Sequence, residues 1–365
     1  MHKIPFTDLK SQYNEAKIYI DTAIKEVITT SSFITGPMVD DFENTIKEYC
    51  GAEDCASTGS GTNALLCALR AAGIGEGDEV ITVSHTFIST TEVICNVGAV
   101  PVFVDIDDFY HMDISGIEHR ITNKTKAILF VDLYGQTPNI NAIKHIATKH
   151  NLMLIEDAAQ SFGSSYKTKK VGSIADITCF SFNPVKNLGA MGDAGAVTGS
   201  KSLMDKVRMY RDHGRPAKNL YGTVGYNARI DNMQAKIIQA KLPFLDEWNR
   251  KRRTIAQTYT SELKSIVQTP KENLDSYHIY YVYVIQTDGR DSLEQHLQNA
   301  GIQTNRHYPT PTHMTPVFSK YANKFLINTE KVRDRILSLP LYHSLSPSDQ
   351  EYIIDKIKQW NQYSS

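Results

Sequence analysis

One segment decides the fold: Phe180-Ser181-Phe182-Asn183-Pro184-Val185-Lys186-Asn187-Leu188-Gly189-Ala190-Met191-Gly192-Asp193-Ala194-Gly195-Ala196. The apolar run over residues 177–182 predicts a strand, and Asn183-Pro184 ends it because proline has no N–H to donate to a neighbouring strand. The glycines that follow allow a tightly bent loop. Lys186 therefore lies at the end of a strand, where open α/β sheets hold their ligands. A lysine there can act as a nucleophile that forms a Schiff base; the alternative is a surface lysine beside a flexible loop.

A second motif places carboxylates at the end of another strand: Leu152-Met153-Leu154-Ile155-Glu156-Asp157-Ala158-Ala159-Gln160-Ser161. Its apolar residues predict a buried strand of a parallel sheet, whose carboxyl end is again the ligand side. A pyridoxal phosphate site needs a lysine for the aldehyde and an acidic partner for the ring nitrogen. Lys186 and Asp157 fit these two roles. Asp157 could also cap a helix that begins at Ala158, and both roles remain open.

These two motifs closely resemble those of the nucleotide-sugar aminotransferases, the DegT/StrS group of fold-type I pyridoxal phosphate enzymes. The similarity extends over nearly the whole chain, from residues 4–9 to the C-terminal helix. The resemblance implies an α/β protein of fold type I, with a mostly parallel seven-stranded sheet flanked by helices. It implies a large cofactor-binding domain over residues 1–242, including the N-terminal helix, and a smaller α/β C-terminal domain over residues 243–365.

Length and composition are those of an ordinary globular protein. The 365 residues are 41% hydrophobic and 22% charged, which is enough to bury a large core. The formal net charge of −1 provides no basic excess for binding nucleic acid. The five cysteines lack paired metal-ligand spacing, so we expect reduced thiols and a cytoplasmic location. No apolar run reaches membrane-spanning length and the N-terminus lacks a signal-peptide core, so we expect no membrane association.

Strands and helices alternate along much of the chain, which predicts a parallel sheet covered on both faces. Further strands are expected at residues 79–83, 100–104, 126–131 and 278–285. Helices are expected at residues 10–30, 38–50, 64–72, 203–213 and 292–300, and between the strands at 100–104 and 126–131.

Small hydroxyl residues precede one of these helices, in the sequence Ser60-Gly61-Thr62. The free N–H groups of a helix N-terminus bind anions, and the lack of a following Gly-Lys-Ser/Thr excludes a Walker motif. A plain helix cap is the favoured interpretation of this motif alone. Beside Asp157 and Lys186, phosphate binding becomes the better one. The family resemblance assigns the cofactor phosphate to these three residues, with help from Ser181.

The resemblance assigns further cofactor contacts. Phe87 would stack on the pyridine ring, and the alternative for it is a core residue. Gln160 would form a hydrogen bond with the ring hydroxyl. Asn227 would reach the cofactor phosphate of a neighbouring subunit, which implies a homodimer with shared active sites.

Three residues are candidates for substrate binding. The Arg229 guanidinium could pair with a nucleotide diphosphate, or instead form a salt bridge with Asp231. Tyr308 and His313 lie in a proline-rich loop that resembles the sugar-binding loop of the family, and the alternative is a rigid structural loop. The basic run at residues 250–253 is expected to be a solvated helix face, with a substrate contact as the alternative.

No metal site is expected. One acidic segment, with Asp105, Asp107, Asp108, His111 and Asp113, could suggest one. The spacing matches no calcium-binding loop, because the glycine and the final glutamate are missing. A solvated loop is the favoured interpretation.

The resemblance implies an aminotransferase that moves the amino group of L-glutamate to a nucleotide-linked keto-deoxysugar, for surface polysaccharides such as lipopolysaccharide O-antigen or for antibiotics. Lys186 would act as general base and acid. The alternatives are a pyridoxal phosphate-dependent sugar dehydratase of the same fold and a non-catalytic sugar-nucleotide-binding regulator. The nucleotide, and amination at carbon 3 or carbon 4, cannot be read from the sequence, because such choices depend on the shape of the pocket.

Overall fold

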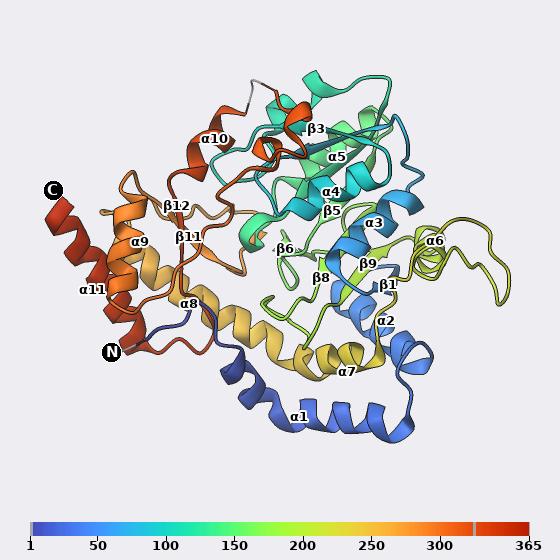
Figure 1. Ribbon diagram of the computed structural model, residues 1–365, viewed down its shortest axis with the longest axis horizontal. Helices are drawn as coiled ribbons and strands as arrows, with labels where there is room; N and C mark the ends of the chain where they lie inside the picture. The colour runs from blue at the N-terminus through green and yellow to red at the C-terminus, as the bar shows by residue number, and fades with distance from the viewer. Residues whose placement is uncertain (1–2, 324–325, 365) are drawn as a thin grey trace.

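A mostly parallel sheet forms the centre of the computed structural model, which describes residues 3–323 and 326–364 (Figure 1). In this part of the chain the central sheet has seven strands in the order β1-β9-β8-β5-β4-β2-β3. Only β9 runs antiparallel to its neighbours in it. The predicted fold class is thereby confirmed. The strands are β1 (Asp54–Thr58), β2 (Glu79–Val83), β3 (Val100–Val104), β4 (Thr125–Val131), β5 (Met153–Asp157), β8 (Ile177–Ser181) and β9 (Gly195–Gly199).

Helices cover both faces of this sheet. Successive residues of a strand point to opposite faces, so each strand contributes side chains to two cores. Cys179 and Val197 pack into one core cluster, whereas Phe180 and Ala196 pack into another. Buried apolar residues on both faces are typical of a parallel sheet between helices. The helices of this part are α1 (Leu9–Thr30), α2 (Pro37–Cys50), α3 (Gly61–Ala71), α4 (Ile88–Asn96), α5 (Ile140–Lys149), α6 (Lys201–Arg211) and α7 (Asn232–Lys241).

The helix predicted between β3 and β4 is wrong. The segment contains only two single turns of 3-10 helix, Ile114–Gly116 and Glu118–Arg120. Asp107 closes the preceding loop by accepting hydrogen bonds from the N–H groups of Phe109 and His111. This loop is not simply solvated, since His111 is only 1% exposed.

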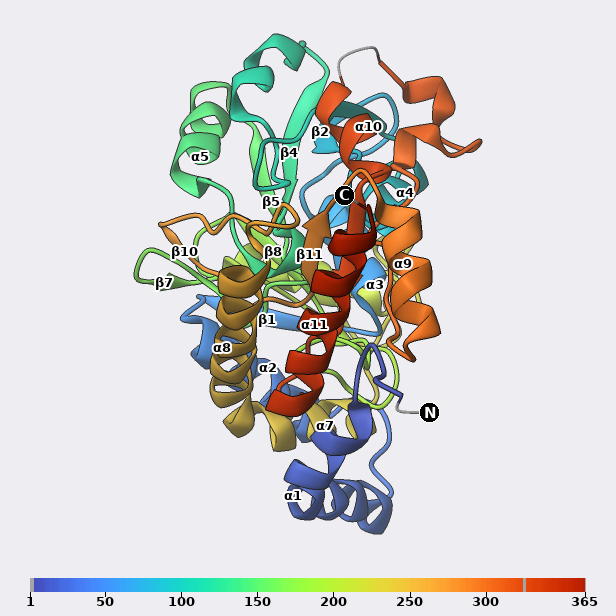
Figure 2. The same ribbon diagram turned by 90° about the vertical axis from the view of Figure 1, so that its left-hand side faces the viewer.

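The C-terminal part forms a second apolar core. Figure 2 shows α11 between α8 and α9. Ile4 joins this core from the start of the chain, and the domain boundary after residue 242 stays a prediction. The elements are α8 (Leu245–Leu263), β11 (Tyr283–Gln286), α9 (Arg290–Asn299), α10 (Ile327–Arg333), β12 (Ile336–Leu339) and α11 (Pro347–Ser364), and a small separate sheet joins β10 (Ser276–Tyr277), β6 (Ser165–Tyr166) and β7 (Lys169–Lys170).

The predicted strand at 278–285 is mostly wrong, because only its last residues pair in β11. Tyr280 has a left-handed backbone with φ of 48°. The N–H groups of Ile279 and Tyr281 donate to the carbonyls of Gly135 and Tyr134, away from any strand. Tertiary contacts with the loop after β4 therefore override the local strand preference.

Five residues lie outside the described part: Met1 and His2 of the predicted large domain, and Lys324, Phe325 and Ser365 of the predicted small domain. Within the described residues, no helix combines the length and the apolar character needed to cross a bilayer. All five cysteines are free.

Candidate active site

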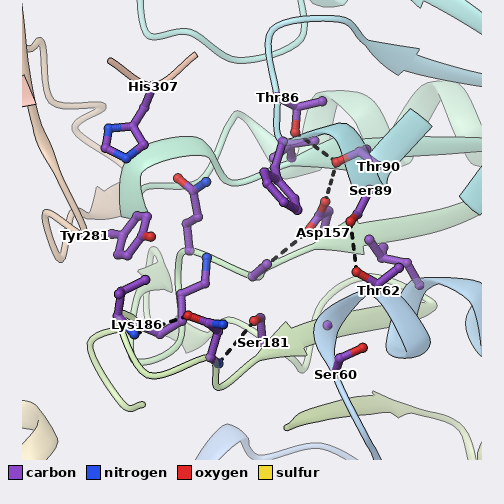
Figure 3. Close-up of a pocket in the computed structure, with 18 of the residues that line it drawn as sticks. Ser60, Thr62, Thr86, Ser89, Thr90, Asp157, Ser181, Lys186, Tyr281 and His307 are labelled. Atoms are coloured by element: carbon purple, nitrogen blue, oxygen red, sulfur yellow. Dashed lines mark hydrogen bonds between the residues drawn. The ribbon is translucent and has the colours of Figure 1, made fainter. Parts of the chain in front are cut away.

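A cavity of about 450 Å³ opens at the carboxyl ends of β5 and β8 (Figure 3). This is the edge of the sheet where ligands of open α/β folds bind. The residues that line it include most of the predicted site: Ser60, Gly61, Thr62, Phe87, Asp157, Gln160, Ser181, Lys186 and Tyr308.

The loop that carries Lys186 is held in place by hydrogen bonds to its backbone. The Gln12 side chain donates to the carbonyl of Asn187 at 3.0 Å, and Lys241 donates to the carbonyl of Gly189. Gly189 is required because a Cβ there would lie 2.3 Å from the carbonyl oxygen of Pro184. The tight turn predicted from the glycines is therefore fixed in place, and the alternative of a flexible loop is wrong.

The Lys186 side chain is half-buried and points into the cavity (Figure 3). Its Nζ lies 4.4 Å from the centre of the Tyr281 ring, which is a cation–π distance. The alternative of an ordinary surface lysine is wrong.

Asp157 lies at the floor of the cavity and is buried. Its Oδ2 accepts a 2.7 Å hydrogen bond from the Thr90 hydroxyl, and its Oδ1 accepts from the N–H of Ala159 at 3.2 Å. Burial raises the pKa of Asp157, while these two donors and the charge of Lys186 oppose that rise. Residues 158–163 form turns and no helix, so the role of Asp157 as a helix cap is wrong.

Ser60, Gly61 and Thr62 at the N-terminus of α3, together with Ser181, line one part of the cavity, here called the phosphate cup. Ser60 is the cap of this helix, since its side chain accepts from the N–H of Asn63 at 3.1 Å. Gly61 approaches Ser181 so closely that a Cβ would lie 2.6 Å from the Ser181 Cβ. The Thr62 hydroxyl contacts the Ser89 hydroxyl at 2.8 Å. Helix N–H groups and hydroxyls here converge on one place, which suits an anion.

Aromatic side chains form the upper wall. Phe87 is 52% exposed, so its alternative as a core residue is wrong. Its ring centre lies 5.9 Å from that of Tyr308. Gln160 fixes this arrangement, because its Nε2 donates to the Tyr308 hydroxyl at 2.9 Å and its Oε1 accepts from the N–H of Tyr134 at 2.8 Å.

Three predicted residues, Asn227, Arg229 and His313, are not among those that line the cavity. Asn227 is exposed on the loop before α7. Arg229 pairs with Asp212 at 2.6 Å, so the predicted salt bridge to Asp231 is wrong. The Asp231 side chain caps α7 instead.

His313 does not face the cavity, which corrects its prediction as a substrate-binding residue. It is 3% exposed, and its Nδ1 lies 2.6 Å from the Ser84 hydroxyl. Its Nε2 lies 3.4 Å from Glu330. Both ring nitrogens are therefore engaged within the fold, as expected of the rigid structural loop that was the alternative.

Sequence reasoning missed several residues that line the cavity, among them Thr90, Tyr281 and His307. Burial and the nearby charge of Lys186 lower the pKa of His307 to about 4, so this imidazole is neutral at neutral pH. The adjacent Tyr308 was predicted, but no motif marks His307 itself.

The cavity fits pyridoxal phosphate. Asp157 would pair with the ring nitrogen, the cup at Ser60, Gly61, Thr62 and Ser181 would hold the phosphate, and Lys186 would bond to the aldehyde carbon. Because Gly61 has no side chain, Ser181 can approach it closely, and this brings the two sides of the cup together. When bound, the cofactor supplies an electron sink for a carbanion next to the reacting amino group.

Fold and site together define a pyridoxal phosphate-dependent enzyme of fold type I. The model of the DegT/DnrJ/EryC1/StrS aminotransferase family matches residues 15–358, and the chain belongs to this family. It is an aminotransferase, and pyridoxal 5'-phosphate is its cofactor.

Individual relatives cover nearly the whole chain. A pleiotropic regulatory protein of Geobacillus stearothermophilus is 42% identical and aligns over 98% of both chains. The UDP-N-acetyl-3-dehydro-alpha-D-glucosamine 3-aminotransferase of Acidithiobacillus ferrooxidans is 40% identical over 94% of both chains. The crystal structure of S. venezuelae DesV in complex with a ketimine intermediate is 36% identical, with a TM-score of 0.97 over 99% of both chains.

Proposed function

We propose that this enzyme transfers the amino group of L-glutamate to the keto group at carbon 3 of a nucleotide-linked sugar. The observation that carries the proposal is the convergence of Lys186, Asp157 and the phosphate cup on one cavity. Several relatives have names that place the amino or keto group at carbon 3. One of them, from Bacillus subtilis, is named a 3-oxo-glucose-6-phosphate:glutamate aminotransferase, which supports glutamate as the donor.

The chain's own residues have distinct roles in this reaction. Asp157 would pair with the ring nitrogen and supply negative charge there, while Thr90 and Ala159 fix the orientation of its carboxylate. Lys186, once free, would act as general base and acid: it would accept a proton from the α-carbon of the donor and deliver it to C4′ of the cofactor. The ring centres of Phe87 and Tyr308 lie 5.9 Å apart at the cavity, and Phe87 would stack on the pyridine ring.

The proposal includes a homodimer in which Asn227 completes the phosphate site of the partner. Exposed apolar side chains support such an interface, because a surface of this kind is usually covered by another protein. They come from α1 and from three loops, the one after α1, the one after β8 and the one before α7: Ile18, Tyr19, Ile28, Phe33, Ile34, Met191, Leu220, Tyr221 and Val224. Arg229 lies near Asn227 in sequence and stays a candidate for the sugar nucleotide.

The aminosugar product would enter surface polysaccharides, such as the O-antigen of lipopolysaccharide, or an antibiotic. The same proposal places the enzyme in the cytoplasm, where the free thiols of its cysteines would stay reduced.

Two half-reactions test the proposed function. The purified enzyme loaded with pyridoxal phosphate is first mixed with L-glutamate, and we expect a change in cofactor absorbance with stoichiometric release of 2-oxoglutarate. It is then given 3-oxo and 4-oxo sugars linked to dTDP, UDP or GDP, and we expect amination of a 3-oxo sugar. Amination of 4-oxo sugars alone would refute the carbon 3 assignment.

A regulatory role is the second candidate, because the 42% identical relative from Geobacillus is named a regulatory protein. A binding protein without catalysis would release no 2-oxoglutarate. A sugar dehydratase would eliminate water from the sugar without transferring nitrogen to it. Mass spectrometry of the sugar product separates these outcomes from amination.

A further inference from the structure

Arg252 of α8 carries a buried positive charge that no carboxylate among the described residues neutralises. Its exposure is 7%, and the other arginine buried to this degree, Arg290, pairs with Asp291 at 2.6 Å. Burial lowers the pKa of Arg252 to about 10, so it still carries its charge at neutral pH. An unpaired charge in a protein interior is costly, which favours a ligand that brings the missing negative charge. The solvated helix face predicted for residues 250–253 is therefore wrong at this position.

One edge of the Arg252 guanidinium is free to bind a ligand. Its Nη1 donates to the carbonyl oxygens of Tyr280, Tyr281 and Leu341 at 3.2, 3.3 and 2.9 Å. Its Nε and Nη2 have no partner among the described residues, and neither is a fully enclosed atom. These two N–H groups lie side by side, which is the geometry that binds both oxygens of one carboxylate.

Arg252 lines a second cavity of about 250 Å³ that adjoins the cofactor cavity. The two cavities share Val185, Tyr281 and His307 as walls. The Tyr281 carbonyl accepts from Arg252, while the Tyr281 ring lies 4.4 Å from the Nζ of Lys186. Tyr281 therefore contacts both the buried guanidinium and the reactive lysine.

The second cavity lies on the substrate side of the site. Figure 3 places Tyr281 and His307 beside Lys186, away from Ser60 and Thr62 at the phosphate cup. A molecule that reacts at Lys186 would thus extend away from the phosphate, toward Arg252. Among the described residues that line the second cavity, Arg252 is the only lysine or arginine.

We propose that the Nε–Nη2 edge of Arg252 binds the side-chain carboxylate of a dicarboxylic amino donor. This inference rests on the proposed function and specifies how the same site recognises its donor. The donor's amino group lies near Lys186, and its distal carboxylate reaches Arg252 past Tyr281 and His307. A sugar ring without a carboxylate gains nothing from Arg252, so one cavity can serve two unlike substrates.

The test compares Arg252→Gln and Arg252→Lys with Arg250→Gln, which changes an exposed arginine on the same helix that pairs with Glu247. Each enzyme, loaded with pyridoxal phosphate, is mixed with L-glutamate or with L-glutamine, and the conversion of the cofactor is followed by absorbance. We expect Arg252→Gln to raise the half-saturating concentration of L-glutamate about 100-fold and to leave that of L-glutamine nearly unchanged. Arg252→Lys should recover part of the loss, and Arg250→Gln should match the wild type.

A binding measurement supplies a readout without catalysis. Glutarate has two carboxylates and no amino group, and calorimetry should detect its binding to the wild type and its loss in Arg252→Gln. Equal weakening of both donors in Arg252→Gln would reveal a purely structural role and overturn the inference.

Other results separate this inference from the proposed function. Equal glutarate binding by the wild type and Arg252→Gln would overturn only the inference, because donor conversion would remain. A wild type that reacts with no amino acid would overturn the proposed function as well. If Arg252→Gln does not fold, the wild type alone decides: equal use of L-glutamate, L-glutamine and L-alanine would contradict a carboxylate-binding Arg252.

Discussion

The cofactor side and the substrate side of the active site are built in different ways. Ser60, Asp157 and Ser181 stand at the ends of strands or at a helix cap, where backbone and side-chain hydrogen bonds fix them. Tyr281 and His307 come from irregular segments of the C-terminal part. The central sheet and the helix cap therefore position the residues of the cofactor side. Tertiary packing of irregular segments positions the residues of the substrate side. Substitutions on the first should alter cofactor chemistry and those on the second substrate selection.

The largest effect of this difference is expected for Asp157→Asn. Asparagine keeps the shape and can still accept from Thr90, but it cannot supply negative charge to a ring nitrogen. We expect the rate of the half-reaction with L-glutamate to fall roughly 10²–10³-fold in the loaded enzyme. Stopped-flow absorbance measures it, with Asp246→Asn at an exposed position as the control. A rate within threefold of the wild type would contradict the role of Asp157.

A smaller effect is expected for Gly61→Ala, which tests the rigidity of the cofactor side. The new Cβ would lie 2.6 Å from the Ser181 Cβ, so one of the two must move out of the phosphate cup. We expect the affinity for pyridoxal phosphate to fall about 10-fold to 100-fold, as an overpacked site usually loses ~1–3 kcal/mol. Titration by fluorescence measures this.

Gly75→Ala is the matched control, because no atom lies within 4 Å of its added Cβ and its backbone is not left-handed. Equal cofactor affinities for the two alanine variants would mean that the cup tolerates side chains, and the cofactor side would not be rigid.

The smallest effect concerns His307 on the substrate side. Its pKa of about 4 lies below the ordinary 6.5 because of burial and the charge of Lys186. The folded state therefore binds fewer protons than the unfolded state between these values, and the stability that His307 contributes above pH 6.5 is lost as the pH falls toward 4. In the cofactor-free protein, Lys186→Met should raise the pKa of His307, as measured by NMR titration. A pKa of His307 at its ordinary value in the unsubstituted protein would contradict this, because it would mean that the His307 side chain is solvated.

The same contrast explains what could be predicted from the sequence. Lys186, Asp157 and Ser60-Gly61-Thr62 belong to short motifs at strand ends, where local pattern fixes both structure and role. Thr90 was missed because its contact with Asp157 joins residues 67 positions apart in the chain. Nothing local distinguishes that threonine from its neighbours on α4.

Fold prediction failed where distant contacts outweigh local preference. The apolar run at 278–285 predicts one strand, yet its first residues form hydrogen bonds with the loop after β4. His313 lies in a loop that resembles a sugar-binding motif, but its Nδ1 is hydrogen-bonded to the Ser84 hydroxyl from another loop. Arg252 looked like part of a solvated run, and only the packing of α8 against Tyr280, Tyr281 and Leu341 buries it.

The most direct test of the central claim is to locate the covalent link to the cofactor. The protein is loaded with pyridoxal phosphate, reduced with borohydride, digested and analysed by mass spectrometry, beside Lys186→Ala. We predict the cofactor mass on the peptide that contains Lys186, and a colourless, unlabelled Lys186→Ala protein. A label on another lysine, such as the buried Lys241 behind the same loop, or a yellow and glutamate-responsive Lys186→Ala, would contradict the account.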